Sequence, residues 1–239
     1  MSRVIATLAL AAVLAGCGGA APETAAAEQA GTALPDLASC PKSEMVDEDY
    51  RERKTPIPLP PAFAGMAATD MDHLAVSTWS GDTVCVDMGW TEMIENPKAS
   101  PDGRFLAFDW GGYEAFGHIV VDRSGKGQVV ETGTAPLAPP TGMRFASIDF
   151  SESAFGGFNA FGVWQIEPVG LHLLAKVEAG FPSGDWRLES WAGDRCVNLS
   201  VVPIDRPSGD PDNEDTPRDP WFAAETRNWK PAPGRCPQE

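Results

Sequence analysis

Short apolar runs, separated by glycine-containing turns, fill the chain from His73 onward. Valine, isoleucine, phenylalanine and tryptophan are concentrated in these runs, as is typical of β-strands. No stretch of this region keeps a helical apolar period for three turns, so the pattern predicts strands and no long helix. We expect strands at Leu74–Thr78, Thr83–Met88, Phe105–Asp109, His118–Asp122, Gln128–Thr132, Arg144–Asp149, Val163–Glu167, Leu171–Val177, Trp186–Trp191 and Cys196–Ile204.

Parts of this pattern repeat along the chain. The segment Gly103–Asp109 recurs loosely as Gly142–Asp149, and Ala115–Val121 recurs as Ala160–Ile166. The spacing is about 40 residues, the length of one four-stranded propeller blade. In addition, the run Ser100-Pro101-Asp102-Gly103 resembles the hairpin of WD40-like propeller repeats, as in the TolB family of periplasmic proteins.

The fold class that follows is all-β. We expect an antiparallel meander with repeated hairpins that is β-propeller-like, with about four short or irregular blades. The expected units cover about 70–98, 99–137, 138–182 and 183–230. A two-sheet β-sandwich is the alternative.

The chain begins with the layout of a secretory signal: one basic residue, Arg3, is followed by the apolar run Val4–Leu14. That run is shorter than the roughly 20 residues that a membrane-spanning helix needs. The sequence Leu14-Ala15-Gly16-Cys17 resembles a bacterial lipoprotein lipobox, which implies a signal peptide at 1–16 and lipidation of Cys17. Because Gly18 is not an aspartate, the resemblance further implies an outer-membrane anchor facing the periplasm.

The remainder divides into two parts. Residues 17–39 are alanine-, glycine- and threonine-rich and predict a flexible tether, and residues 40–239 predict a single β domain. Within the domain we expect a short helix at Lys42–Lys54 and an extended proline-rich strap at Pro56–Pro61.

Acylation of Cys17 leaves Cys40, Cys85, Cys196 and Cys236, an even number that predicts two disulfides in an oxidising compartment. We favour Cys40–Cys85 with Cys196–Cys236, and the alternative is Cys85–Cys196 with Cys40–Cys236. Removal of residues 1–16 takes away one basic residue, so the mature chain has 17 basic and 34 acidic residues and a formal charge of −17. Such a surface repels nucleic acid and favours a cationic partner, although acidity also serves solubility.

Catalytic motifs are absent from the sequence: there is no nucleophile elbow, phosphate-binding loop or zinc-binding helix. We therefore expect no cofactor and assign no catalytic or metal-binding residue. His73, His118 and His172 are far apart and are interpreted as packing or surface residues.

Two loops inside the repeats, Trp110–Phe116 and Ser151–Asn159, combine aromatic, acidic and glycine residues, a composition suited to a binding surface on a rigid β scaffold. Their candidate residues are Trp110, Tyr113, Glu114, Phe116, Glu152, Phe155, Phe158 and Asn159. The phenylalanines could instead fill the core where strands turn.

The function expected from these features is a lipid-anchored envelope protein whose β domain binds a partner, such as another envelope protein, or acts as a scaffold. Two alternatives stay open. One is a hydrolase of an envelope polymer that uses the carboxylates of Glu114 and Glu152. The other is an acidic binder of a cationic protein.

Overall fold

The computed structural model describes residues 33–43, 53–112, 115–150, 157–206 and 216–237. Within these residues the strands form four antiparallel sheets, each paired in chain order, and the helical elements are three short 3₁₀ turns. The first sheet contains β1 (Ala67–Thr69), β2 (His73–Ser77) and β3 (Thr83–Asp87). The second contains β4 (Met93–Ala99), β5 (Phe105–Gly112), β6 (Ala115–Asp122) and β7 (Gln128–Glu131). The third contains β8 (Arg144–Asp149), β9 (Ala160–Glu167) and β10 (Gly170–Val177). The fourth contains β11 (Gly184–Ala192), β12 (Cys196–Pro203), β13 (Asp219–Ala224) and β14 (Pro231–Pro233).

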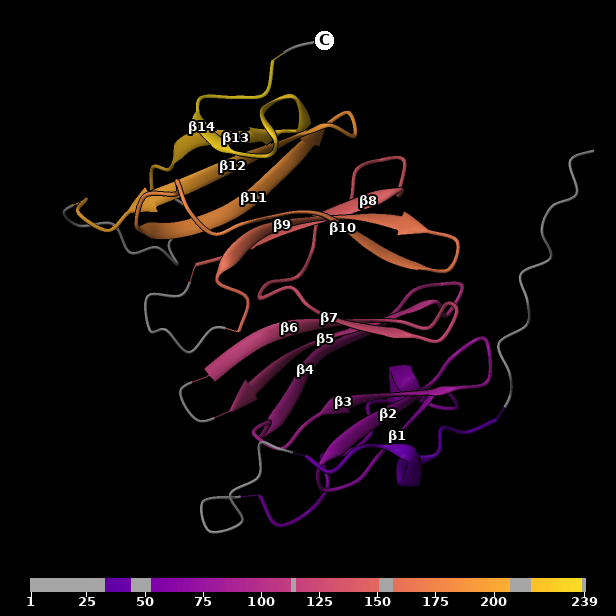
Figure 1. Ribbon diagram of the computed structural model, residues 1–239. Helices are drawn as coiled ribbons and strands as arrows, with labels where there is room; N and C mark the ends of the chain where they lie inside the picture. The colour runs from indigo at the N-terminus through magenta and orange to yellow at the C-terminus, as the bar shows by residue number, and fades with distance from the viewer. Residues whose placement is uncertain (1–32, 44–52, 113–114, 151–156, 207–215, 238–239) are drawn as a thin grey trace, which may run out of the picture.

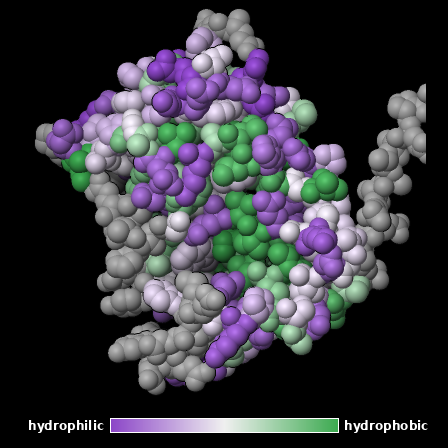
Figure 2. Space-filling view, viewed as in Figure 1, coloured by the Kyte–Doolittle hydropathy of each residue, from purple (hydrophilic) through white to green (hydrophobic). Residues whose placement is uncertain are grey.

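The four sheets are stacked in chain order, with the first and fourth sheets at opposite ends, so they do not close into a ring (Figure 1). The prediction of an all-β antiparallel meander is confirmed. On the face seen in Figure 2, apolar residues reach the surface near the middle of the stack, whereas polar residues predominate toward the fourth sheet.

Three apolar layers hold the stack together, and we call them the first, middle and third interlayers in chain order. The first, between the first and second sheets, includes Phe63, Leu74, Val76, Leu106, Phe108, Ile119 and Val121. The middle, between the second and third sheets, includes Val130, Phe145, Phe158, Ala160, Trp164 and Leu171. The third includes Ala146, Ile148, Phe161, Val163, Trp186, Val197, Leu199 and Trp229. Strand alternation produces this pattern, because the third sheet places Phe161 and Val163 on one face and Trp164 on the other.

An arginine crosses from one sheet to the next at each interlayer. In the first interlayer, the guanidinium of Arg123 donates to the carbonyl of Ser77 at 2.6 Å and to that of Gly103 at 2.7 Å. In the middle interlayer, Arg104 donates to the third-sheet carbonyls of Glu167 at 2.6 Å and Gly170 at 3.1 Å. The same guanidinium binds both carboxylate oxygens of Asp122 within its own sheet, at 3.0 and 2.8 Å. In the third interlayer, Arg144 donates to the carbonyl of Asp194 at 2.9 Å. These charge-assisted bonds satisfy backbone carbonyls at the sheet junctions.

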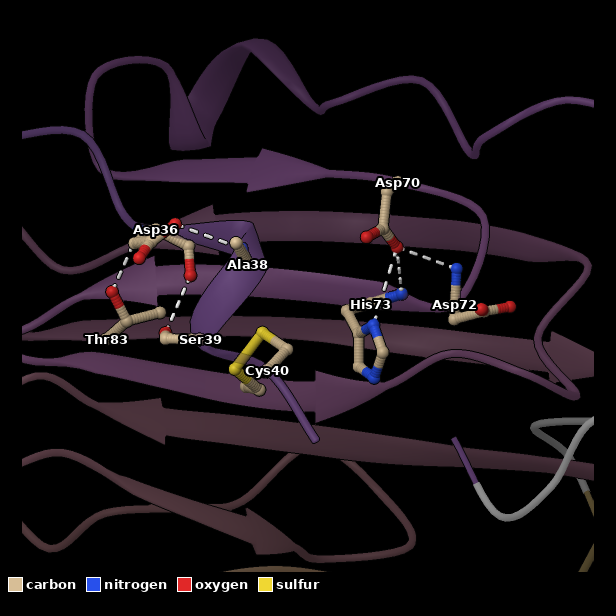
Figure 3. Close-up of a disulfide and its surroundings, with 9 residues drawn as sticks. Asp36, Ala38, Ser39, Cys40, Asp70, Asp72, His73 and Thr83 are labelled. Carbon is tan, nitrogen blue, oxygen red and sulfur yellow. Dashed lines mark hydrogen bonds and ion pairs between the residues drawn. A yellow bond between two sulfur atoms is a disulfide. The ribbon is translucent and has the colours of Figure 1, made fainter. Parts of the chain in front are cut away.

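A chain segment covers the outward face of the first sheet. Cys85 lies on that face, opposite the apolar first interlayer, and forms a disulfide with Cys40. The preceding 3₁₀ turn η1 (Leu37–Ser39) contacts β2 and β3, and the amide of Asp36 donates to the hydroxyl of Thr83 at 2.9 Å. Figure 3 shows this turn and disulfide beside the buried His73.

The outward face of the fourth sheet is covered in the same way. Cys196 lies on that face and forms a disulfide with Cys236, whose amide donates to the side-chain oxygen of Asn198 at 2.9 Å. Both disulfides are the favoured pairing predicted from the sequence. Each therefore fixes a terminal segment against a sheet face that no other sheet covers.

Each expected strand overlaps an observed one, but the structure adds β1, β4, β13 and β14. β4 lies in the expected first unit and instead forms an edge of the second sheet. Prolines in β4, β13 and β14 disguised these strands, since proline is tolerated at sheet edges and bulges.

Other expectations concern the segments that precede the strands. Most of the expected helix at Lys42–Lys54 lies outside the described residues. The tether boundary needs correction, because residues 36–39 already pack on the first sheet. The expected strap at Pro56–Pro61 ends one residue earlier, because Pro61 begins the 3₁₀ turn η2 (Pro61–Phe63), and its Ile57 is buried in the first interlayer.

The turn between β4 and β5 has the geometry that its sequence predicts. The Asp102 carboxylate accepts from the amide of Arg104 at 3.0 Å, and Gly103 has a φ of 70°. A positive φ favours glycine at this position.

We predict that Arg104→Met lowers the free energy of unfolding by about 3 kcal/mol, because it leaves the carboxylate of Asp122 buried without its cation. Arg104→Met/Asp122→Asn should recover part of the loss. Chemical denaturation measures both values. The control is Arg187→Met, at a half-exposed arginine whose ion pair with Asp185 spans 3.6 Å, for which we expect a change of about 1 kcal/mol or less. Equal losses in the control and in Arg104→Met would contradict the assigned role.

We also predict that each disulfide adds about 4 kcal/mol to the free energy of unfolding, because it restricts the entropy of the unfolded chain. The bridged cysteines are 45 and 40 residues apart, so Cys40→Ser/Cys85→Ser and Cys196→Ser/Cys236→Ser should have similar costs. Calorimetry of the two double variants tests this. A Tm unchanged in either variant would show that the corresponding cap is dispensable.

Candidate functional site

A short crossing segment, Glu131–Thr134, leads from the second sheet to the third. The amide of Thr132 donates to the carbonyl of His118 in β6 at 2.8 Å. On the other side, the hydroxyl of Ser147 in β8 donates to the carbonyl of Thr132. The segment therefore brings the ends of β6 and β8 to the same level of the middle interlayer.

A histidine–aspartate pair lies on the second sheet at this level. His118 is directly opposite Asp109 in the β5–β6 register, and its Nδ1 lies 2.5 Å from Asp109 Oδ1. The side-chain amide of Asn96 donates to the other Asp109 oxygen at 2.7 Å. His118 is 4% exposed, and its Nε2 is buried without a hydrogen-bond partner. When Nδ1 donates to Asp109, Nε2 of the neutral ring is an unused acceptor.

Asp149 approaches from the third sheet. It shares a face with Phe145 and Trp164, which pack in the middle interlayer, so its side chain faces the second sheet. The residue is 9% exposed, and its Oδ2 is buried without a partner. Gly133 contacts it so closely that an added Cβ atom would collide with Asp149 Cβ, and Gly133 also has a φ of 71°. Glycine is therefore required at this crossing point.

Glu131 connects the ends of the two predicted loops. Its Oε1 would lie 3.1 Å from a Cβ atom added to Gly117 at the start of β6, and a side chain at Gly157 before β9 would collide with the same carboxylate. The described ends of both loops therefore meet at Glu131.

The carboxyl groups of Glu131 and Asp149 are both electrostatically unfavourable as anions. Burial raises the pKa of the Glu131 carboxyl, and the charge of Asp149 raises it further, while Lys176 opposes the rise. Burial also raises the pKa of the Asp149 carboxyl. Lys176 already forms a 3.0 Å ion pair with Glu178, so it is shared between carboxylates. Titratable groups with such perturbed pKa values are typical of functional sites.

Met93 and Phe116 form an exposed apolar rim beside the His118–Asp109 pair, and Trp90 is a further exposed apolar residue. Met93, Gly111 and Phe116 are opposite one another across β4, β5 and β6. Their face also carries Asp109 and His118, two residues further along the strands. The exposed fractions of Trp90, Met93 and Phe116 are 56%, 48% and 54%.

The structure sorts the predicted binding-surface residues. Phe116 and Asn159 are exposed, and Trp110 is half-buried with its indole nitrogen buried and unpartnered. Phe158 is wrong as a surface candidate, since it is 6% exposed and packs 5.5 Å from the ring of Trp164. Cys17, Tyr113, Glu114, Glu152 and Phe155 lie outside the described residues.

Sequence reasoning did not single out Asp109, Glu131 or Asp149, and it interpreted His118 as a packing or surface residue. A usable signal existed, because Asp109 and Asp149 each end one copy of the repeated segment, directly before the two loops. Their burial depends on which sheet covers them and has no sequence signature.

In the part of the chain that the structure describes, no three histidine, cysteine or acidic side chains are grouped in a way that suits a metal ion. A helix long and apolar enough to cross a bilayer is likewise not found among the described residues. No known protein-family model matches this chain, and no curated protein matches it.

We predict that Glu131→Gln and Asp149→Asn each raise Tm near neutral pH. The pKa of each carboxyl is higher in the folded chain than its ordinary value of 4.5 or 3.8, so folding favours the protonated form. That contribution to stability is present below about pH 4 and is lost as the pH rises through the folded pKa. The amide variants should therefore gain about 2–4 °C or more at about pH 7 and little at about pH 4.

The matched control is Asp205→Asn, which removes an exposed carboxylate outside the interlayer. Thermal unfolding at both pH values compares the three variants. An equal gain from Asp205→Asn would assign the effect to net charge, against a local origin at Glu131 and Asp149.

Proposed function

We propose that this chain is a lipid-anchored protein of the bacterial cell envelope, held at the outer membrane and facing the periplasm, whose β domain binds a partner. The arrangement of its cysteines carries the first half of this proposal. Four of the five form the two disulfides, which suit an oxidising compartment. The fifth, Cys17, directly follows the lipobox-like residues Leu14-Ala15-Gly16, where acylation would remove an odd thiol.

The buried polar side chains of the middle interlayer support the second half. Buried acceptors without partners on Asp149 and His118 lower stability unless something supplies a donor. His118 lies on the same sheet face as the exposed Met93 and Phe116, two residues further along the strand. A polar group beside exposed apolar side chains on a rigid sheet is the usual composition of a binding site.

Binding suits this cluster better than hydrolysis does. A glycosidase of the usual kind needs one protonated and one ionised carboxyl, in environments that move their pKa values apart. Here burial raises the pKa of both Glu131 and Asp149. The hydrolase that uses Glu114 and Glu152 stays a prediction, because neither residue is among those described.

The anchor is tested by Cys17→Ser. We expect this variant to move from the membrane fraction to the soluble fraction, since acyl chains supply the membrane affinity. Fractionation followed by mass measurement of the mature amino terminus reports the result. The control is Ser39→Ala, which leaves the lipobox intact and should stay with membranes. Sedimentation of Cys17→Ser with membranes would contradict the proposal.

The partner is tested by crosslinking in cells. The wild-type lipidated chain should give a discrete crosslinked species, whose second component is identified by mass spectrometry. A domain that gives no such species under conditions that crosslink known envelope complexes would argue against a binding role.

A further inference from the structure

The third sheet is open along one edge. Its outer strand, β10, pairs with β9 on one side, and no strand among the described residues pairs with its other side (Figure 1). In the same part of the chain, the second and fourth sheets have four strands each, whereas the third has three. The outer side of β10 therefore presents backbone donors and acceptors where a fourth strand would lie.

The other sheet edges are covered, short or interrupted. β3 contacts β7 and β8 contacts β11, so these four edges lie against a neighbouring sheet. β1 and β14 have three residues each, and β4 contains Pro97 and a β-bulge. Short length and proline are usual protections of an edge strand, but β10 has eight residues and no proline.

The backbone of β10 directs hydrogen-bonding groups outward at Leu173. The amide of Leu171 points away from β9, because it donates to Gln128 Oε1 at 3.0 Å. Residues two apart along a strand direct their backbone groups to the same side, so the amide and carbonyl of Leu173 also point away from β9. The register shifts between Leu173 and Ala175, and such a bulge bends the strand. The regular pairing surface is therefore a short segment centred on Leu173.

The side chains along this edge are apolar at its centre and acidic near its ends. Leu173 is 45% exposed and shares a sheet face with Leu171, which packs in the middle interlayer. An apolar residue on an added strand would lie beside Leu173 and cover it. Glu167 is exposed before the β9–β10 turn, and Glu178, whose side chain is 66% exposed, follows β10. Basic residues near the ends of an added strand would complement these carboxylates.

Neither the rest of this chain nor a second copy suits that position. Residues 18–32 and 207–215 contain no valine, isoleucine or aromatic residue, the types that favour strands. Residues 44–52 include five acidic residues, which would be repelled by Glu167 and Glu178. Two mature chains, each with a formal charge of −17, repel one another. The added strand therefore belongs to a different, basic protein.

We propose that β10 binds an extended segment of a partner protein by strand addition, with an apolar residue against Leu173 and basic residues near Glu167 and Glu178. Main-chain hydrogen bonds to the outer side of β10 supply the affinity, and the apolar and basic side chains supply the specificity. This inference rests on the proposed binding function and adds a contact surface and the chemistry of the partner.

The test uses the full chain in non-ionic detergent and a capped lysine–threonine–valine–threonine–valine–lysine peptide as probe. The comparison peptide has proline at the third and fourth positions, which keeps the charge and removes donors from both edges of the peptide. At about pH 7 and low salt, calorimetry should show the first peptide binding about tenfold or more tighter than the second. Hydrogen exchange measured by mass spectrometry should slow in the segment that contains Leu173.

Two variants test the edge itself. Leu173→Pro removes the outward donor and leaves pairing with β9 intact, because that amide points away from β9. Leu173→Lys keeps the donor and places a like charge against the basic peptide, so it tests the edge even where the proline variant does not fold. We expect each to lower the affinity by about tenfold or more.

The control is Ile204→Lys, which makes a similar change at a 63% exposed position after β12. We expect it to keep near wild-type affinity. Equal losses in Leu173→Lys and Ile204→Lys would show that net charge governs binding, and would overturn the assigned edge. Equal affinity for both peptides, or no binding of either, would overturn strand addition.

Crosslinking in cells separates this inference from the function on which it rests. A partner whose crosslink is lost in Leu173→Lys and kept in Ile204→Lys supports both. A partner whose crosslink survives in both variants keeps the binding function and overturns the edge as its site. The absence of any partner in the wild type overturns the binding function itself.

Discussion

The structure depends on one constraint: each sheet is too small to bury its own apolar residues and must be covered on its faces. Stacking in chain order covers the inner faces, and an arginine at each junction binds across to the next sheet, as Arg104 does. The two outward faces have no further sheet to cover them. Terminal segments cover them instead and are fixed by Cys40–Cys85 and Cys196–Cys236. The two ends of the open stack are therefore covered by terminal segments that disulfides hold in place.

The same constraint makes the middle interlayer unusual. Its apolar part, around Trp164, is packed as in the other interlayers. It also contains the buried polar side chains of Asp149 and His118. Buried polar groups are normally paired, so unused acceptors on Asp149 and His118 mark a place where packing alone did not decide the residues.

Strands and turns were predictable because their signals are local. Alternation of apolar residues located β8 at its observed bounds, and the Asp102–Gly103 turn formed as its residues require. Edge strands such as β4 and β14 were not predictable, since proline and charge obscure a pattern that only pairing with a neighbour reveals. The repeat predicted the spacing of the strands, but it did not predict the interlayer in which each matching side chain packs. The matching residues Phe105 and Phe145 both pack in the middle interlayer instead of in successive ones.

The sequence by itself determined the all-β class and the positions of most strands, and it favoured the observed pairing of the cysteines. Tertiary structure decided which faces meet, and therefore which polar residues are buried. Side chains alternate between sheet faces, so a shift of one residue in the β5–β6 register would turn Asp109 and His118 toward the first sheet. Local sequence encodes the strand, but the sheet that covers a strand determines whether a carboxylate such as Asp149 is solvated or buried.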